Sequence, residues 1–249
     1  MAIYFNGMTE DETLGMVEAM INSGATLDFS CTKNYAADKH STGGIGDKVS
    51  LILAPLLASV GMTIPMIAGR GLEYTGGTID KLESIPGFKT NPTLEQFSAW
   101  VELNGCAIMS QTQQICPADG KLYTLRDRTA TVPSIPLICS SIMSKKIAEG
   151  IQGLILDIKV GNGTFMKTVN QGRELGLWMQ KIGQAFKVNT DIVFTSMEQP
   201  LGQFAGLRCE IIESMNCLNG DGPKDTMAVS LELGSRLAVQ AGLTEDTNS

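Results

Sequence analysis

The stretch that decides the fold is residues 64–78, with the sequence Ile64-Pro65-Met66-Ile67-Ala68-Gly69-Arg70-Gly71-Leu72-Glu73-Tyr74-Thr75-Gly76-Gly77-Thr78. Its first five residues form a short apolar run, which predicts a buried strand. Glycines follow the run directly, and the residues after Thr78 favour a helix. A buried strand that leads through a Gly-rich loop into a helix is typical of layered α/β proteins, which bind ligands beyond the carboxyl ends of their strands.

Strands and helices alternate on both sides of this stretch. Capping boxes at Thr9 and Thr93 predict two helix starts, and Gly105 is expected to close the second helix. Pro55 should bend the helix expected after residue 48, or lie in its first turn. The alternation predicts an α/β fold with a mostly parallel or mixed sheet flanked by helices. The remaining expected strands are residues 106–110, 153–160 and 189–196, and the remaining helices are residues 134–150, 169–187 and most of 197–242.

A Gly-rich loop at residues 41–47, Ser-Thr-Gly-Gly-Ile-Gly-Asp, has the features of an anion site. Glycines let backbone N–H groups approach an anion, and the N-terminus of a following helix adds partial positive charge. Lys39 supplies a full charge, and Ser41 and Ser50 can donate hydroxyl hydrogen bonds. The Walker A spacing is absent. Taken alone, the loop is better explained as a solvated turn with a capping serine.

The loop at residues 69–78 makes an anion site the stronger interpretation of both loops. It also opens a helix, and Thr78 could donate to the same anion. Two such loops in one domain are hard to explain by turn formation alone. Arg70 has two interpretations: it binds an anion, or it pairs with a carboxylate such as Asp80.

A third group of residues offers hydrogen-bond donors. Tyr123 and Arg126 lie at i and i+3, and Ser141 and Lys145 lie at i and i+4, so each pair shares a helix face. Such donors suit the carbonyl oxygens of a pyrimidine. From the spacing alone, exposed helix polarity is the stronger interpretation.

Composition excludes several classes of protein. The net charge of −7 argues against a nucleic-acid surface, and no apolar run approaches the roughly 18 residues of a membrane helix. The six cysteines form no CxxC motif and the chain has one histidine, so a Cys/His zinc site is not expected. Irregular cysteine spacing is typical of reduced thiols in a cytoplasmic protein.

Long motifs make this sequence resemble the thymidine/pyrimidine-nucleoside phosphorylase family from end to end. They follow one another in the order found in that family. The motifs are Lys39-His40-Ser41-Thr42-Gly43-Gly44-Ile45-Gly46-Asp47, Gly69-Arg70-Gly71-Leu72, Thr75-Gly76-Gly77-Thr78, Asp80, Leu82-Glu83-Ser84-Ile85-Pro86-Gly87-Phe88, Pro117-Ala118-Asp119, Tyr123, Arg126-Asp127, Thr129-Ala130-Thr131-Val132, Lys145-Lys146 and Asp157-Ile158-Lys159-Val160-Gly161.

The resemblance implies phosphorolysis: phosphate attacks C1′ of a pyrimidine nucleoside with inversion as the base leaves. Inorganic phosphate would be the co-substrate, with no required cofactor. A bound cation near Gly46, with Glu213 as one ligand, and a homodimer of the full-length protein are also implied. The implied catalytic residues are His40, Arg126 and Lys145; the phosphate ligands are Lys39, Ser41, Ser50 and Thr78; the pyrimidine contacts are His40, Tyr123, Arg126, Ser141 and Lys145.

The sequence departs from the family pattern in three places. Ala68 stands where a serine is common, which removes one donor to phosphate, and Glu73-Tyr74 replaces what is often Gly-His. The third departure is length. Residues 1–25 are expected to be the remnant of an α-helical domain and residues 26–249 the α/β catalytic domain, with residues 119–150 and 208–245 packing against the helical part.

Two alternatives stay open. A fragment of this kind could bind phosphate or a pyrimidine without turnover, because catalysis in the family involves closure between domains. A phosphoribosyltransferase of the anthranilate type shares the fold and the Gly-rich loops, although the Tyr123, Arg126, Ser141 and Lys145 set argues against it. The preference among thymidine, deoxyuridine and uridine is not set by the sequence.

Overall fold

A parallel sheet forms the centre of the molecule. The computed structural model describes residues 1–71, 76–164 and 166–247. Within these ranges one sheet has the order β1-β4-β5 and a second pairs β2 with β3, all in parallel. An isolated bridge between Ala36 and Thr63 connects the two sheets. The strands are β1 (Ala37–Ser41), β2 (Ile64–Ala68), β3 (Cys106–Ser110), β4 (Gly153–Val160) and β5 (Asn189–Ser196).

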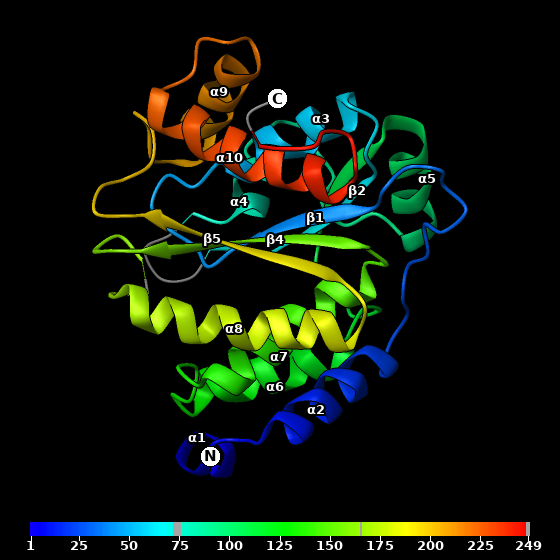
Figure 1. Ribbon diagram of the computed structural model, residues 1–249, viewed down its shortest axis with the longest axis vertical. Coiled ribbons are helices and arrows are strands. Elements are labelled where there is room, and N and C mark those ends of the chain that lie inside the picture. The colour runs from blue at the N-terminus through cyan, green and yellow to red at the C-terminus, as the bar shows by residue number, and fades with distance from the viewer. Residues whose placement is uncertain (72–75, 165, 248–249) are drawn as a thin grey trace.

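Helices cover both faces of the sheet (Figure 1). The layer on one face contains α6 (Pro117–Arg128), α7 (Ile135–Ala148) and α8 (Val169–Ala185), and α2 (Glu10–Asn22) packs beneath α7, with α1 (Ala2–Asn6) beyond it. The layer on the other face contains α3 (Val49–Ser59), α4 (Thr78–Glu83), α9 (Leu207–Leu218) and α10 (Lys224–Gln240). Helix α5 (Leu94–Asn104) packs on β2 and β3. The predicted α/β class is confirmed.

Alternation along β4 separates two hydrophobic clusters. Leu154, Leu156 and Ile158 are buried against α7 and α8, whereas Ile155 joins the cluster formed with α3 and α10. Because successive side chains of a strand point to opposite faces, Asp157 and Lys159 lie on the same face as Ile155. Both charged residues are fully buried there.

Capping residues in the sequence correctly predicted where two helices begin and where one of them ends. Thr9 and Thr93 both form the predicted capping boxes, and Gly105 ends α5 in the left-handed conformation at φ 75°. Pro55 does not lie in the first turn of its helix, which was one of the two expectations. Helix α3 begins at Val49, so the proline lies in the helix interior.

Strand β1 is the element that sequence reasoning missed. The sequence Ala-Asp-Lys-His-Ser has no apolar run, and it was expected to be the flank of a Gly-rich loop. Its first three residues are nevertheless buried, next to β4. Charged residues can occupy a central strand when opposite charges compensate them, and the partners of Asp38 and Lys39 come from distant segments.

The predicted packing of residues 208–245 with the α-helical domain stays a prediction, and within this chain residues 208–245 pack on other elements than α2. Helix α10 packs on α3 and β4, where Leu233 and Leu237 enter the cluster with Leu53. Helix α2 lies on the other face, against α7. The boundary near residue 25 itself stays a prediction. In the described ranges no helix has the length and hydropathy needed to cross a membrane, and the six cysteines there are free thiols.

Candidate active site

Strand β1 divides the predicted site between the two faces of the sheet. By alternation, Lys39 and Ser41 face the layer of α3 and α4, while His40 faces the layer of α7. The Lys39 ammonium lies 3.5 Å from an Asp47 carboxylate oxygen and 3.7 Å from one of Asp157. It is buried and makes no hydrogen bond among the described residues. Its N–H groups are therefore available to an anion at the end of the strand.

Charged residues hold the first Gly-rich loop in place. Lys159 pairs with Asp157 at 2.8 Å and lies 3.9 Å from Asp47. Burial alone would raise the pKa of Asp47, but Lys159, Lys39 and Lys81 outweigh it and hold that pKa well below its usual range. Asp47 is therefore ionised at neutral pH. Within the loop, the Ser41 hydroxyl accepts a hydrogen bond from the Gly43 N–H at 3.1 Å.

The second Gly-rich loop is joined to the first. Thr78 is the first residue of α4, and the Lys81 ammonium on the same helix donates to the Asp47 carbonyl at 2.5 Å and pairs with Glu210 at 2.8 Å. Ser50 lies in the first turn of α3, directly after the first loop. Lys39, Ser41, Ser50 and Thr78 thus lie on elements that meet at the first loop. Thr75 and the unusual Glu73-Tyr74 pair lie outside the described residues.

Arg70 pairs with carboxylates. Its guanidinium contacts Glu83 at 2.7 and 2.8 Å and Asp80 at 3.0 Å. The hydrogen bonds from Arg70 lower the pKa of Glu83 to about 2. Of the two interpretations of Arg70, the ion pair is the one that the structure supports.

His40 is partly buried on the α7 side of β1, and three lysines on the two faces of the strand are close enough to act on its charge. Burial lowers its pKa well below the usual 6.5, and the charges of Lys146, Lys39 and Lys145 lower it further. The imidazole is therefore neutral at pH 7. The effect of Lys145 on His40 also indicates that Lys145, one of the predicted pyrimidine contacts, lies near β1.

The predicted pyrimidine contacts form a network between α6 and α7. Lys145 contacts Asp119 at 2.5 Å and donates to the Ser141 hydroxyl at 2.9 Å. Arg126 is buried and donates to the carbonyls of Val132 at 2.7 Å and Leu137 at 3.2 Å. Exposed helix polarity, the stronger interpretation of the spacing, is wrong for Arg126 and Ser141, because helix packing buries both.

Tyr123 completes this group on the same helix as Arg126. Its side chain is half-buried, and burial raises the pKa of its phenol. Asp119, at the start of α6, is fully buried and keeps one carboxylate oxygen without a hydrogen-bond partner in the described structure. The network therefore combines ammonium, hydroxyl and guanidinium donors with one buried carboxylate.

Glu213 does not have the surroundings expected of a metal ligand. One of its oxygens contacts the Lys48 ammonium at 2.5 Å, and the other accepts the Gln203 N–H at 2.9 Å. No group of three metal-binding side chains occurs in the described residues. The cation beside Glu213 is thus a lysine of the chain, and the residues do not fit an additional metal ion.

Several contributors to the site were quoted in motifs but given no role. They are Asp119, Asp157 and Lys159, and Lys81 contributes from outside the quoted motifs. A signal was available for one pair, because Asp157 and Lys159 alternate within an otherwise apolar strand and must share a face. For Lys81 and Asp119 the sequence carried no comparable signal, since their partners lie on other elements.

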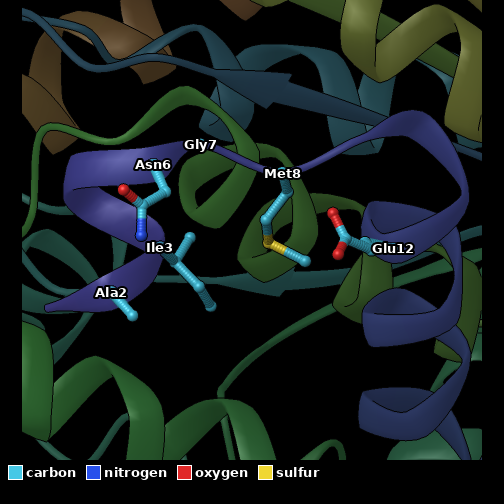
Figure 2. A pocket seen from close by; sticks show the side chains of 6 residues that line it. All are labelled: Ala2, Ile3, Asn6, Gly7, Met8 and Glu12. Atoms are coloured by element: carbon cyan, nitrogen blue, oxygen red, sulfur yellow. The ribbon is translucent and has the colours of Figure 1, made fainter.

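Two surface hollows lie away from these residues. One, of about 340 Å³, lies between α1 and α2, where Ile3, Met8 and Glu12 line it (Figure 2). Its lining offers one carboxylate and no basic side chain, which does not favour an anion. Another, of about 430 Å³, lies along residues 83–91. Neither contains a predicted site residue.

Comparison with known proteins gives a family and a fold. The family description "Glycosyl transferase family, a/b domain" matches residues 33–248. The chain is 48% identical over 241 residues to the pyrimidine-nucleoside phosphorylase of Geobacillus stearothermophilus, covering 97% of this chain and 56% of that protein. It is 47% identical over 245 residues to the Staphylococcus aureus protein of the same name, covering 98% of this chain and 57% of that protein. The chain thus spans little more than half the length of these relatives.

Among solved structures, anthranilate phosphoribosyltransferase from Thermus thermophilus has a TM-score of 0.74 at 16% identity, covering 98% of this chain and 78% of that one. The Saccharomyces cerevisiae enzyme has a TM-score of 0.64 at 14% identity, covering 96% and 73%. Identities this low show the fold alone, which agrees with the parallel sheet described above. From residue 33 to residue 248, the chain belongs to the glycosyl transferase family as its a/b domain.

Proposed function

We propose that this chain is the catalytic part of a pyrimidine-nucleoside phosphorylase. It would cleave thymidine, deoxyuridine or uridine with phosphate to give the free base and a pentose 1-phosphate. The observation that carries the proposal is the Lys39 ammonium, which is buried without a hydrogen bond where two Gly-rich loops meet. The names of relatives 47–48% identical to the chain support the same reaction.

The alternation of β1 supports separate sides for the two substrates. Phosphate would bind Lys39, Ser41, Ser50 and Thr78, and the base would contact residues from the α6 and α7 layer. A phosphate oxygen attacks C1′ opposite the base and forms the new C–O bond. The C1′–N bond breaks, and its electron pair passes to the departing pyrimidine. The base contacts are His40, Tyr123, Arg126, Ser141 and Lys145.

Charge on the departing base would be stabilised by fixed cations. Lys145 is oriented by Asp119 and Ser141, and Arg126 is anchored by two carbonyls. Preorganised donors of this kind are typically the largest single catalytic contribution, about 10²–10³ in rate for each donor. Neutral His40 would act as a hydrogen-bonding group. Protonation of the base by His40 is disfavoured by its lowered pKa.

Three further features belong to the proposal. Residues 1–25 would be part of an α-helical domain, and the longer protein would form a homodimer. Inorganic phosphate would be the only co-substrate. Ala68, at the end of β2, would weaken phosphate binding by about 1 kcal/mol relative to a serine.

A binding-only chain is the second candidate. Turnover can require closure between domains, and the chain spans 56% of one relative's length, so binding and turnover by these residues are tested separately. The test is ultraviolet-monitored release of thymine and uracil from thymidine and uridine, with and without phosphate. Release that requires phosphate supports the phosphorylase. Folded protein that binds phosphate but releases no base supports the binding-only candidate, and release without phosphate contradicts both.

A further inference from the structure

Lys48 carries a buried cation inside a group of oxygen atoms. Its ammonium contacts the Leu201 carbonyl at 2.8 Å, the Phe204 carbonyl at 3.1 Å and a Glu213 carboxylate oxygen at 2.5 Å. The Lys48 side chain is fully buried and that of Glu213 is 3% exposed. An ammonium has three N–H donors, so these three oxygens use all of its hydrogen-bonding capacity. We call this group the 201–213 oxygen cage.

The backbone of the cage leaves space for this cation and little else. Gly202 has φ 76°, and a Cβ atom at this position would lie 2.6 Å from both the Lys48 ammonium and the Glu213 carboxylate. Any side chain at residue 202 would therefore collide with the ion pair. The Gly202 N–H donates to Asp225 at 2.9 Å, which also holds this turn in place.

Main-chain carbonyls and a carboxylate are the ligands that hard metal cations take in proteins. The resemblance implied a bound cation with Glu213 as a ligand, and the structure places a lysine ammonium there instead. We propose that Lys48 is a tethered replacement for a metal cation, so that the 201–213 oxygen cage needs no free ion.

The position of Lys48 gives this cation a role in shaping the phosphate side of the site. Lys48 is the residue before α3, between Asp47 and Ser50. The Leu201 N–H also donates to the Ile45 carbonyl at 3.0 Å, so two links join the first Gly-rich loop to the cage. Lys48 is a positioning residue in this view: it contacts no substrate but holds the loop that carries Asp47 and the helix that carries Ser50.

The experiment compares wild-type protein with Lys48→Ala in potassium chloride, ammonium chloride and choline chloride at equal ionic strength. Wild-type protein should unfold at the same temperature in all three salts. Lys48→Ala should have a lower midpoint in choline, and potassium or ammonium ions should raise it by about 3 °C or more, because a free ion refills the cage. Lys181→Ala is the matched control, since Lys181 is an exposed lysine paired with Glu10 at 2.6 Å.

Two results would overturn the proposal. One is a wild-type midpoint that rises in potassium but not in choline, which would mean that a metal ion still binds. The other is a Lys48→Ala protein that small cations do not stabilise, including one that remains unfolded in all three salts. Because unfolding midpoints need no turnover, this outcome is separate from the outcome for the proposed phosphorylase activity.

Discussion

Lys39 and His40 are adjacent in sequence, yet the pleat of β1 directs them to opposite faces of the sheet. Lys39 joins Asp47 and Asp157, while His40 lies close enough to Lys145 and Lys146 for their charges to lower its pKa. Under the proposed function, these two adjacent residues would therefore contact two different substrates. A one-residue shift of β1 would exchange these roles, so the register with β4 matters as much as the residue types.

Arg126 is expected to be both functional and structural. Arg126→Ala removes the donors to the Val132 and Leu137 carbonyls. This should lower the free energy of unfolding by about 1–3 kcal/mol, and kcat/KM for the nucleoside should fall about 100-fold or more. Arg126→Lys keeps the charge but not the planar fork, so it should recover only part of each loss. Urea unfolding and the base-release assay measure the two effects.

Wild-type kcat/KM in a folded Arg126→Ala protein would remove Arg126 from the base site. Loss of stability with unchanged rate would reduce Arg126 to a structural anchor of the turn between α6 and α7.

His40 should stay neutral through the pH range in which an ordinary histidine titrates. It is the one histidine of the chain, so its imidazole proton signals can be followed without assignment. Burial and the neighbouring lysines lower its pKa well below 6.5. The signals should therefore show no titration step near pH 6.5, which nuclear magnetic resonance can test directly.

The same shift makes stability depend on pH. Below pH 6.5 the unfolded chain binds a proton that native His40 does not bind. The free energy of unfolding should therefore fall as pH drops from 6.5 toward the native pKa. Glu149 acts in the opposite direction, since burial raises its native pKa. Comparison with His40→Gln isolates the histidine contribution, and an unchanged pH dependence in that variant would contradict the neutral assignment.

At the scale of elements, the pattern of apolar residues was enough to predict four of the five described strands. Strands β2, β3, β4 and β5 have the predicted ends, and each contains a short run of apolar residues. Strand β1 was not predicted because its stability depends on Lys146 and Asp157, which are more than 100 residues away in sequence. The motifs identified the candidate site residues, but not the partners that hold them. Those partners are set by tertiary packing, which local sequence does not encode.

Two helical glycines should respond oppositely to alanine. Gly172 of α8 is buried, and a Cβ there would lie 2.9 Å from Ile158 Cγ2 on β4. Gly172→Ala should cost about 1–3 kcal/mol through overpacking. Gly15 of α2 is exposed with open space around it, so Gly15→Ala should stabilise by about 0.5–1 kcal/mol. Urea unfolding of both variants tests whether α8 packs as closely on the sheet as described, and a stabilised Gly172→Ala protein would contradict it.

At the scale of the whole molecule, binding and turnover place different demands on the chain. The proposed phosphate ligands lie on β1, α3 and α4, and the proposed base contacts lie on β1, α6 and α7. All of these elements belong to one sheet and the helices that flank it. Phosphate binding should therefore need only the part of the fold described above, whereas turnover could also require motion between domains.

Phosphate should consequently stabilise this chain whether or not it releases base. A ligand that binds only the native state at about 100 times its Kd adds about 2.7 kcal/mol. For a chain of this size that corresponds to a rise of about 5–10 °C in the unfolding midpoint. Lys39→Met removes the ammonium that has no hydrogen bond and should abolish most of the rise, while Lys181→Met should keep it. An equal phosphate-induced rise in the unfolding midpoint of the two variants would mean that phosphate binds away from β1. That result would contradict the proposed binding of the two substrates on the two faces of the sheet.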